Sequence, residues 1–227
     1  MQLNRVRVIG VVPMGLIGVG LCSVSALAID WVEPRNNDAS DVPLIAQEVV
    51  GEGELNSING SLTGQPLLGL DFRDMYAFNV VNPTNFSAQV VASVPVPVLY
   101  LFDADGRGVL ASQINPAFES NLPGFGRRAT DGTESAVLNP GRYFIAIAGF
   151  GNIPVDSAGN PIFAFGTRTE VSGPDGTGGA NPIAGWLNDG DTGSYRIEFT
   201  GSGGIPSVGS LPTLALGALV ASRRRRS

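Results

Sequence analysis

Apolar and polar residues alternate with a period of two in several segments between residues 30 and 204, and no window there has a sustained helical period. In "DMYAFNVV", this alternation places Tyr76, Phe78 and Val80 on one face, and "SYRIEFT" near residue 200 has the same pattern. Side chains at every second position share a face of a β-strand. We therefore expect an all-β protein.

Turn-forming residues bound these segments, as strands joined by tight turns require. Strands are predicted at 46–50 and 55–58 around a Gly-Glu-Gly turn, and "FSAQVVASV" follows an Asn-Pro turn. "PVLYLFDADGRGVLAS" reads as a hairpin that turns at 103–106, and "LNPGRYFIAIAGF" enters its strand through Asn-Pro-Gly. About eight short strands favour a single β-sandwich of jelly-roll type, spanning 29–204.

Residues 151–193 form a Gly/Pro-rich excursion that departs from this pattern. They contain ten Gly and four Pro, and a structureless stretch of that length is either functional or misread. "PIFAFGT" within it is predicted to be an extra strand. "VSGPDGTGGANP" is predicted to be an exposed loop, where binding sites tend to occur.

The N-terminal segment, 1–28, has the layout of a secretory signal peptide with a helical apolar centre. Arg5 and Arg7 precede an apolar run at 8–24, and Ala26 and Ala28 supply a small-residue cleavage site. The alternatives are an uncleaved membrane helix or a lipoprotein anchored at Cys22. Because Cys22 is the only cysteine, the mature chain would contain no disulfide.

The C-terminal segment, 205–227, ends in a short apolar helix and an arginine cluster. Residues 209–222 would span about 21 Å as a helix, against about 30 Å for a bilayer core. The cluster, which would stay on the cytoplasmic side, consists of Arg223, Arg224, Arg225 and Arg226. We therefore expect a sorting signal that associates transiently with the membrane; a frayed basic tail is the alternative.

Composition removes several kinds of chemistry. The chain has no His and no Lys, which excludes a Ser-His-Asp triad, a Cys-His pair, a His-ligated zinc site and a Walker A loop. Its net charge is -6, and outside the two end segments 8 Arg face 20 acids, a balance of -12. Such a body repels nucleic acid. Carboxylates, hydroxyls and backbone groups are left to form a site.

Four aspartates are the candidate metal ligands. "DADG" at 103–106 resembles the start of a calcium loop, because Asp oxygens at alternate positions can converge on a hard cation. If this turn folds over the first long strand, Asp71, Asp74, Asp103 and Asp105 would form a composite calcium site. The alternative is a plain hairpin turn with no metal.

Two further motifs fit ordinary structure better than chemistry. Asp191 begins an Asp-Thr-Gly-Ser sequence like that of aspartic proteases, but no second copy exists to supply the partner carboxylate. It is predicted to be a turn. Arg127 and Arg128 could pair with an anionic polymer, although pairing with Asp131 and Glu134 is the simpler reading.

Two segments resemble known families. "IPSVGSLPTLALGALVASRRRRS" is similar to the PEP-CTERM class of sorting signals, which implies export, cutting near Pro206 by an exosortase-like sorting enzyme, and a bacterial origin. The series "DFRDMYAFNV", "VLYLFDADGRGVLAS", "LNPGRYFIAIAGF" and "SYRIEF" resembles the bacterial pre-peptidase C-terminal (PPC) sandwich domain over about 71–200. That resemblance implies an extracellular, non-catalytic module that in some members binds calcium or a polymer.

The sequence thus predicts an acidic, exported, non-enzymatic protein of the cell envelope or extracellular matrix, which uses the export machinery and needs no cofactor. A calcium- or polysaccharide-binding extracellular module is the alternative. A hydrolase that uses carboxylates alone is a third reading, and it requires two carboxyl groups about 5 to 9.5 Å apart in a cleft.

Overall fold

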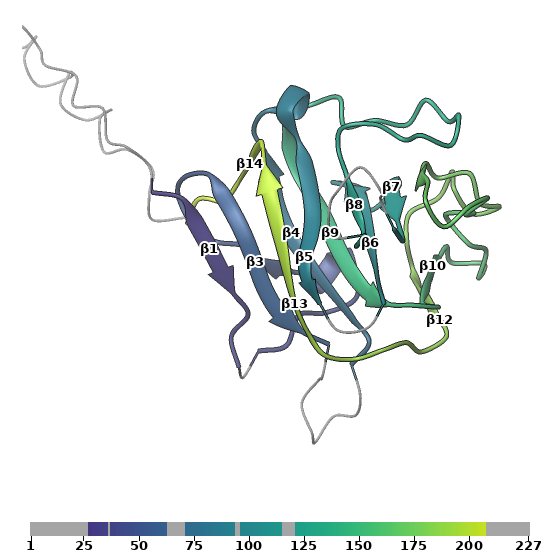
Figure 1. Cartoon of the computed structure of the whole chain (residues 1–227), viewed down its shortest axis with the longest axis horizontal. Helices are drawn as coiled ribbons and strands as arrows, with labels where there is room; N and C mark the ends of the chain where they lie inside the picture. Colours follow the sequence, from purple (N-terminus) through teal and green to yellow (C-terminus); the bar gives the residue numbers. More distant parts are fainter. Residues whose placement is uncertain (1–26, 36, 63–70, 94–95, 115–120, 208–227) are drawn as a thin grey trace, which may run out of the picture.

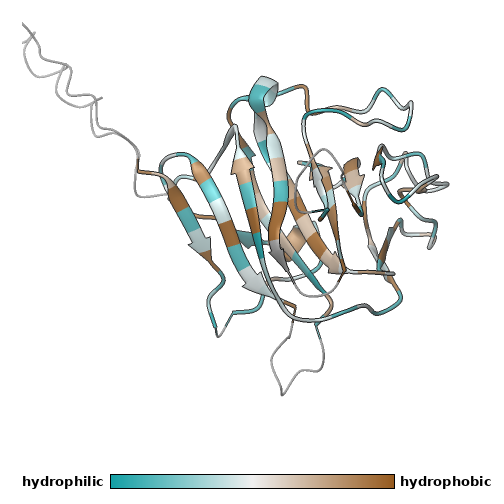
Figure 2. Cartoon of the chain, in the orientation of Figure 1, coloured by the Kyte–Doolittle hydropathy of each residue, from teal (hydrophilic) through white to brown (hydrophobic). Residues whose placement is uncertain are grey.

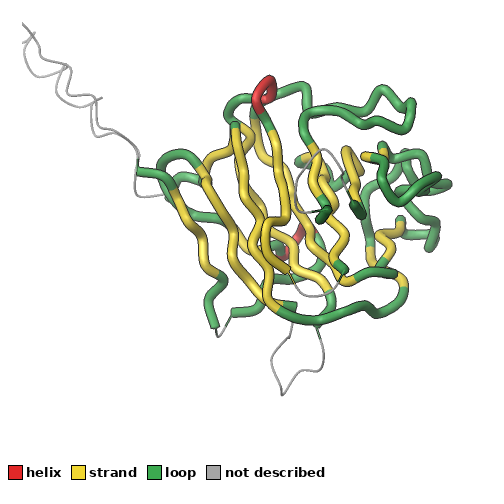
Figure 3. Tube along the Cα trace, in the orientation of Figure 1, coloured by secondary structure: helices red, strands yellow, loops and turns green. Residues whose placement is uncertain are grey.

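The computed structural model describes residues 27–35, 37–62, 71–93, 96–114 and 121–207. These residues form two main β-sheets and a small third one (Figure 1). The chain is all-β, as predicted, and its only helices in the described part are the 3-10 turns η1 (Pro43–Ile45) and η2 (Pro83–Asn85) (Figure 3).

The first sheet has five strands in the order β1-β3-β13-β5-β8. β1 runs parallel to β3, and the other neighbours are antiparallel. The bounds are β1 Ile29–Val32, β3 Leu55–Ser61, β13 Ser194–Thr200, β5 Ser87–Ser93 and β8 Gly124–Phe125.

The second sheet follows the order β11-β7-β6-β9-β4-β14, with β2 also paired to β4. A two-stranded ribbon, β10-β12, lies apart from both. The bounds are β2 Gln47–Glu48, β4 Arg73–Val80, β6 Pro97–Asp103, β7 Gly108–Ser112, β9 Gly141–Gly149, β11 Val171–Ser172, β14 Ser202–Gly203, β10 Ile153–Val155 and β12 Gly185–Leu187.

The main core lies between the two sheets, as in a sandwich. The alternation predicted for β4 is confirmed, because Tyr76, Phe78 and Val80 all point into this core. Phe78 of the second sheet meets Phe199 of the first, with ring centroids 5.4 Å apart. Figure 2 shows apolar and polar residues alternating along the strands of the first sheet, whose outer face is polar.

A second core covers the outer face of the second sheet. The side chains of β6 and β9 that point away from the main core, such as Tyr100 and Phe102, pack against Ile162, Phe163 and Ile183 of the excursion. Phe163 contacts both rings, at centroid distances of 5.6 and 6.0 Å. Because both its faces are buried, β6 is apolar along almost its whole length.

The excursion at 151–193 is therefore a structural cover. Of "VSGPDGTGGANP", predicted to be an exposed loop, Val171 and Ser172 form the buried strand β11, and much of the rest is exposed. "PIFAFGT" is not a strand: within 161–167 only an isolated bridge at Pro161 has β-pairing. Gly residues let this irregular segment pack backbone against backbone. A Cβ on Gly179 would lie 1.9 Å from the carbonyl oxygen of Pro174.

The first and last described strands meet at one end of the molecule. The Ile29 amide donates to Glu54 O, while the Ile205 amide donates to Val49 O. A Cβ on Gly204 would lie 2.6 Å from the Ile29 side chain, so the two segments pack together. The chain thus enters and leaves the folded body at neighbouring points (Figure 1).

The finer fold predictions are not confirmed. The strand orders do not establish a jelly-roll connectivity. The two flanking helices fall on 1–26 and 208–227, outside the described residues. Among the described residues, no helix has the length and apolarity that crossing a bilayer requires.

Candidate functional site

Four acidic side chains gather where the turn after β1 meets the start of β4. Glu33, Asp38 and Asp74 each offer a carboxylate oxygen, and these three oxygens lie within 4.8 Å of one another. The Asp71 carboxyl group is in hydrogen-bonding contact with that of Asp74. We call these four residues the carboxylate cluster.

Glu33 is held by backbone amides on both sides. β1 pairs in parallel with β3, and the pairing continues as the Glu33 amide donates to Asn59 O at 2.9 Å. Its carboxylate accepts from the amide of Ala39 through Oε1 and from the amide of Ser61 through Oε2, each at 3.0 Å. These two bonds aim the Glu33 side chain at the cluster.

The turn that carries Asp38 is tied to both sheets. Gln47 receives the indole N–H of Trp31 on its Oε1, at 3.2 Å, and donates its Nε2 to Asn37 O, at 2.7 Å. The Met75 amide donates to Ser40 O at 2.8 Å. Hydrogen bonds at Asn37 and Ser40 therefore hold the turn that carries Asp38 next to β4.

Asp74 is fully buried, with none of its surface exposed to solvent. Its Oδ2 accepts the hydroxyl of Tyr195 at 2.6 Å, and the Tyr195 oxygen is 2.6 Å from that of Tyr76. Since a phenol has one proton, Tyr76 must donate to Tyr195 when Tyr195 donates to Asp74. This chain of bonds joins β13 of one sheet to β4 of the other.

Gly60 of β3 makes room for the two hydroxyls. It lies opposite Tyr195 in the strand pairing. A Cβ at this position would be 2.3 Å from the Tyr195 hydroxyl oxygen and 2.8 Å from that of Tyr76. No real side chain tolerates such distances, so the glycine is required by the tyrosine pair.

Two buried oxygens of the cluster, Asp74 Oδ1 and Asp71 Oδ2, receive no N–H or O–H donor from the described residues. A hydrogen bond between the Asp71 and Asp74 carboxyl groups can satisfy them only if one of the two groups is protonated. Asp71 Oδ1, by contrast, accepts the Arg73 amide at 3.2 Å. A buried carboxylate oxygen without a donor is unfavourable unless a proton or a cation occupies the space beside it.

The electrostatics agree with that geometry. Burial, followed by the charges of Glu33 and Asp71, raises the pKa of Asp74 well above its ordinary value. Burial also raises the pKa of Glu33, Asp38 and Asp71. Arg73 directs its guanidinium away, to Asp41, Asn152 and the loop at 188–189.

The donor set suits calcium better than other common metals. Calcium binds oxygen at 2.3–2.6 Å, so two ligands on opposite sides of the ion lie at most about 5 Å apart. The three oxygens lie within 4.8 Å of one another, a distance that calcium can span. Magnesium demands a near-ideal octahedron and keeps several waters, whereas calcium accepts a flexible set of carboxylates. Zinc prefers nitrogen and sulfur ligands, which these four residues lack.

The structure brings together two of the four predicted ligands. Asp71 and Asp74 belong to the cluster, but Asp103 and Asp105 do not. Along β9, Asp74 pairs with Ile147 and Asp103 with Tyr143, which separates them by about 13 Å along the strand alone.

The Asp103 side chain bonds to amides of its own "DADG" turn, and the turn does not fold over β4. Asp103 Oδ1 accepts the amides of Asp105 and Arg107, both at 2.9 Å. These bonds make an ordinary hairpin turn, the alternative that the sequence also allowed.

Glu33 and Asp38 were not predicted as ligands. They flank a polar turn that follows a four-residue strand, and the sequence gives no sign that this turn reaches β4. Only the parallel pairing of β1 with β3 brings it there. The one available signal was that Glu33 and Asp38 stand on either side of the turn-forming sequence "PRNN".

The remaining sequence candidates lie elsewhere. Asp191 is exposed in a turn that packs its backbone on Gly149, as predicted for this motif. Arg127 donates to Val137 O, and Arg128 is exposed. Of the processing residues, Ala28 and Pro206 are exposed. Those outside the described residues are Ala26, Arg223, Arg224, Arg225 and Arg226.

No protein-family model matches this chain, and no curated protein is significantly similar to it in sequence. The two family resemblances therefore stay predictions. The geometry of the carboxylate cluster is the basis on which a function can be argued.

Proposed function

We propose that this protein is a non-enzymatic, extracellular β-sandwich module whose carboxylate cluster binds one calcium ion. The observation that carries the proposal is the pair of buried oxygens, Asp74 Oδ1 and Asp71 Oδ2, to which no N–H or O–H group of the described residues donates. An ion between Glu33, Asp38 and Asp74 would compensate the buried charge of Asp74, which lies against Asp71. Calcium then serves as a structural ligand of the fold.

The placement of the cluster says what the ion would do. Glu33 and Asp38 lie in the segment that follows β1 of the first sheet. Asp71 precedes β4 of the second sheet, and Asp74 is the second residue of that strand. A shared ion would join the two segments and neutralise their mutual repulsion. Extracellular calcium modules work at dissociation constants of about 0.1–1 mM, which matches a medium outside the cell.

Two features of the folded body support export with removal of both ends. Ile29, the residue after Ala28, is the first residue of β1. The Ile205 amide donates to Val49 O, and Pro206 directly after it is exposed. Cutting at these two places would leave every described strand intact. We propose that the PEP-CTERM-like segment delivers the module to the cell envelope or matrix.

Calcium titration followed by calorimetry and thermal melting tests the metal. The wild-type chain should bind one calcium ion per chain and melt at a higher temperature with about 1 mM calcium than with a chelator. Asp38→Asn, which lies in the more open part of the cluster, should weaken calcium binding about tenfold or more.

Asp105→Asn is the matched control for that experiment. It removes one exposed aspartate from the hairpin turn and should leave the titration unchanged. Magnesium at the same concentration should shift the melting temperature much less than calcium. Equal effects of Asp38→Asn and Asp105→Asn, or no heat of binding in the wild type, would remove the proposal.

Mass spectrometry of the secreted protein tests the processing independently of the metal. The mature species should begin near Ile29 and end near Pro206. An extracellular product that still contains Arg226 would contradict removal of the sorting segment.

A further inference from the structure

A cavity opens between the excursion and the outer face of the second sheet, away from the carboxylate cluster. Its volume is about 480 Å³, within the range of about 300–1,000 Å³ that is usual for small-molecule sites. Its walls come from β6, from the turn after β9 and from the excursion. The aromatic residues among them are Tyr100, Phe150, Phe163 and Phe165.

The deeper wall of the cavity is rigid. The Tyr100 hydroxyl donates to Asn152 O at 2.7 Å, and the Tyr100 ring packs against those of Phe163 and Trp186. Asn152 is fixed as well, because its Oδ1 accepts Arg73 at 2.6 Å and its Nδ2 donates to Gly149 O at 2.9 Å. The polar side-chain atoms of Tyr100 and Asn152 already have hydrogen-bond partners. This wall therefore offers a ligand aromatic rings and no free polar atom of these two residues.

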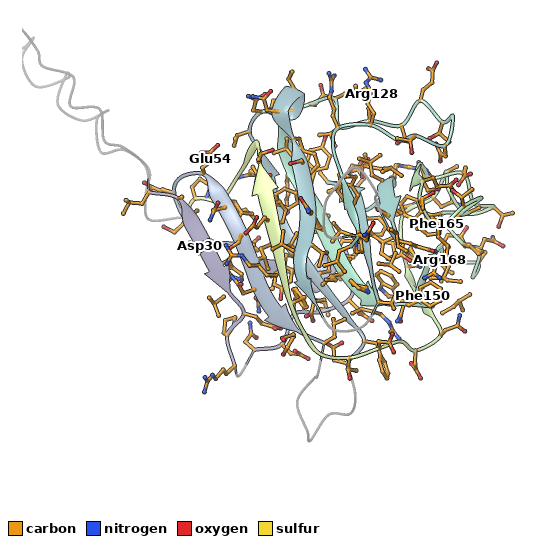
Figure 4. All side chains as sticks on the ribbon, in the orientation of Figure 1. Asp30, Glu54, Arg128, Phe150, Phe165 and Arg168 are labelled. Carbon is orange, nitrogen blue, oxygen red and sulfur yellow. The ribbon has the colours of Figure 1, made fainter. Side chains whose placement is uncertain are left out.

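Two polar side chains at the cavity are uncommitted. Gln113 lines it, and no hydrogen bond to its side chain comes from the described residues. Arg168 lies beside it: its guanidinium is 4.8 Å from the centre of the Phe150 ring, and Phe150 is part of the lining. Figure 4 shows Phe150, Phe165 and Arg168 on the same side of the molecule.

The guanidinium of Arg168 is not paired with a carboxylate in the described part of the chain. Among the described residues the salt bridges involve Arg73, Arg142 and Arg196, and Arg168 forms none. The neighbouring Glu170 is occupied, because its carboxylate accepts the amides of Gly166 and Thr167. The guanidinium therefore lies unpaired against Phe150, one of the aromatic rings that line the cavity.

We propose that this cavity binds a small aromatic carboxylate, with its ring among the aromatic side chains and its anionic group on Arg168. The aromatic walls favour a planar ring through stacked and edge contacts. The guanidinium pairs with a carboxylate in a forked geometry. Among the described lining residues, Gln113 is the other polar side chain without a hydrogen bond, so a heavily hydroxylated ligand such as a sugar would lose hydrogen bonds here.

The test uses 2-naphthoate and its neutral isostere 2-naphthamide, titrated into the full chain and followed by ligand-observed NMR and calorimetry. The carboxylate should bind more tightly than the amide, by about fivefold, as expected for one partly exposed ion pair. Arg168→Gln should remove that difference and leave naphthamide binding as it was. Arg128→Gln, which removes an exposed arginine from a distant loop, should change neither ligand (Figure 4).

A second variant tests the location of the site. Ala164 is exposed and lines the cavity, so Ala164→Trp should block both ligands without loss of the cooperative melting transition. Equal binding of naphthoate and naphthamide to the wild type would overturn the anionic part of the proposal. Undiminished binding to Ala164→Trp, or no binding of naphthoate at all, would overturn the site.

Discussion

Asp74 is the residue on which the proposed metal function depends. A buried carboxylate with one oxygen unpaired and two acidic neighbours destabilises a folded protein, unless a proton or a cation compensates it. Its Tyr195 partner satisfies only one of the two oxygens. A cation or a proton bound at the second oxygen of Asp74 in the native state would remove this cost.

The neutral variant Asp74→Asn should therefore act in opposite directions on stability and on binding. Without calcium at neutral pH, it should stabilise the protein by about 1–3 kcal/mol, the range for relieving an unsatisfied buried polar group. The stabilisation by calcium should be largely lost. Urea unfolding with and without calcium measures both effects. A variant less stable than the wild type in chelator would show that the unpaired oxygen carries no penalty.

Gly60 provides a test of the tyrosine pair. Gly60→Ala places a methyl group on the hydroxyls of Tyr195 and Tyr76 and should cost about 2 kcal/mol, the usual penalty for overpacking a core. Gly185→Ala is the matched control, because a Cβ at that strand position meets nothing within 4 Å. Chemical unfolding of the two variants gives the comparison, and equal stabilities would contradict the close approach seen at Gly60.

At the scale of elements, the excursion acts as a third layer. It leaves the second sheet after β9, covers the outer faces of β6 and β9, and returns to the first sheet as β13. Arg73, between Asp71 and Asp74, bonds Asn152 and Asn188 at the two ends of this layer. The cluster and the cover are thus connected through one side chain.

Removing a buried side chain of the cover should show how much the cover contributes to the stability of the protein. Phe163→Ala should destabilise the protein by about 3 kcal/mol, since the Phe163 ring is buried against Tyr100 and Phe102. Phe150→Ala, at a ring that is 42% exposed, should cost under about 1 kcal/mol. Thermal and urea unfolding compare the two. Similar small losses would mean that the excursion is not an integral layer.

The strands that could be predicted from the sequence are the long ones: β13, which alternates between buried and solvated residues, and β4, β6 and β9, which are apolar and bounded by turn residues. β8, β11 and β14 have two residues each, too few to show a period. "PIFAFGT" was predicted to be a strand because it is apolar, but Ile162 and Phe163 are buried by the outer face of the second sheet without strand pairing. For the site, only Asp71 and Asp74, three residues apart in sequence, could be placed together. Glu33 and Asp38 arrive through a non-local parallel pairing.

For the whole molecule, the raised pKa values imply an unusual dependence of stability on pH. A carboxyl group whose folded pKa is raised stabilises the folded state while it is protonated, and this contribution is lost as pH rises through the folded pKa. Asp74, Glu33, Asp38 and Asp71 all have this sign. Asp131 and Asp156, whose pKa values are lowered, act in the opposite direction at lower pH.

In chelator, the free energy of unfolding should therefore be lower at about pH 7.5 than at about pH 5, because both lie above the ordinary pKa values of these carboxyl groups. Calcium at ten times its dissociation constant should restore about 1.4 kcal/mol at the higher pH, and less at the lower pH, where protons compete for the same oxygens. Denaturant unfolding at the two pH values, with and without calcium, gives the four numbers needed. A chelated protein that is more stable at pH 7.5 than at pH 5 would contradict the sign.

The meeting of Ile29 and Ile205 at one end also decides how the domain can be mounted. A support attached to either terminus would hold the molecule at the same end. The cover, with β10 and β12, lies at the opposite end of the molecule and would point away from the support in both cases (Figure 1). Orientation on a surface is thus built into the fold and does not depend on which extremity is the anchor.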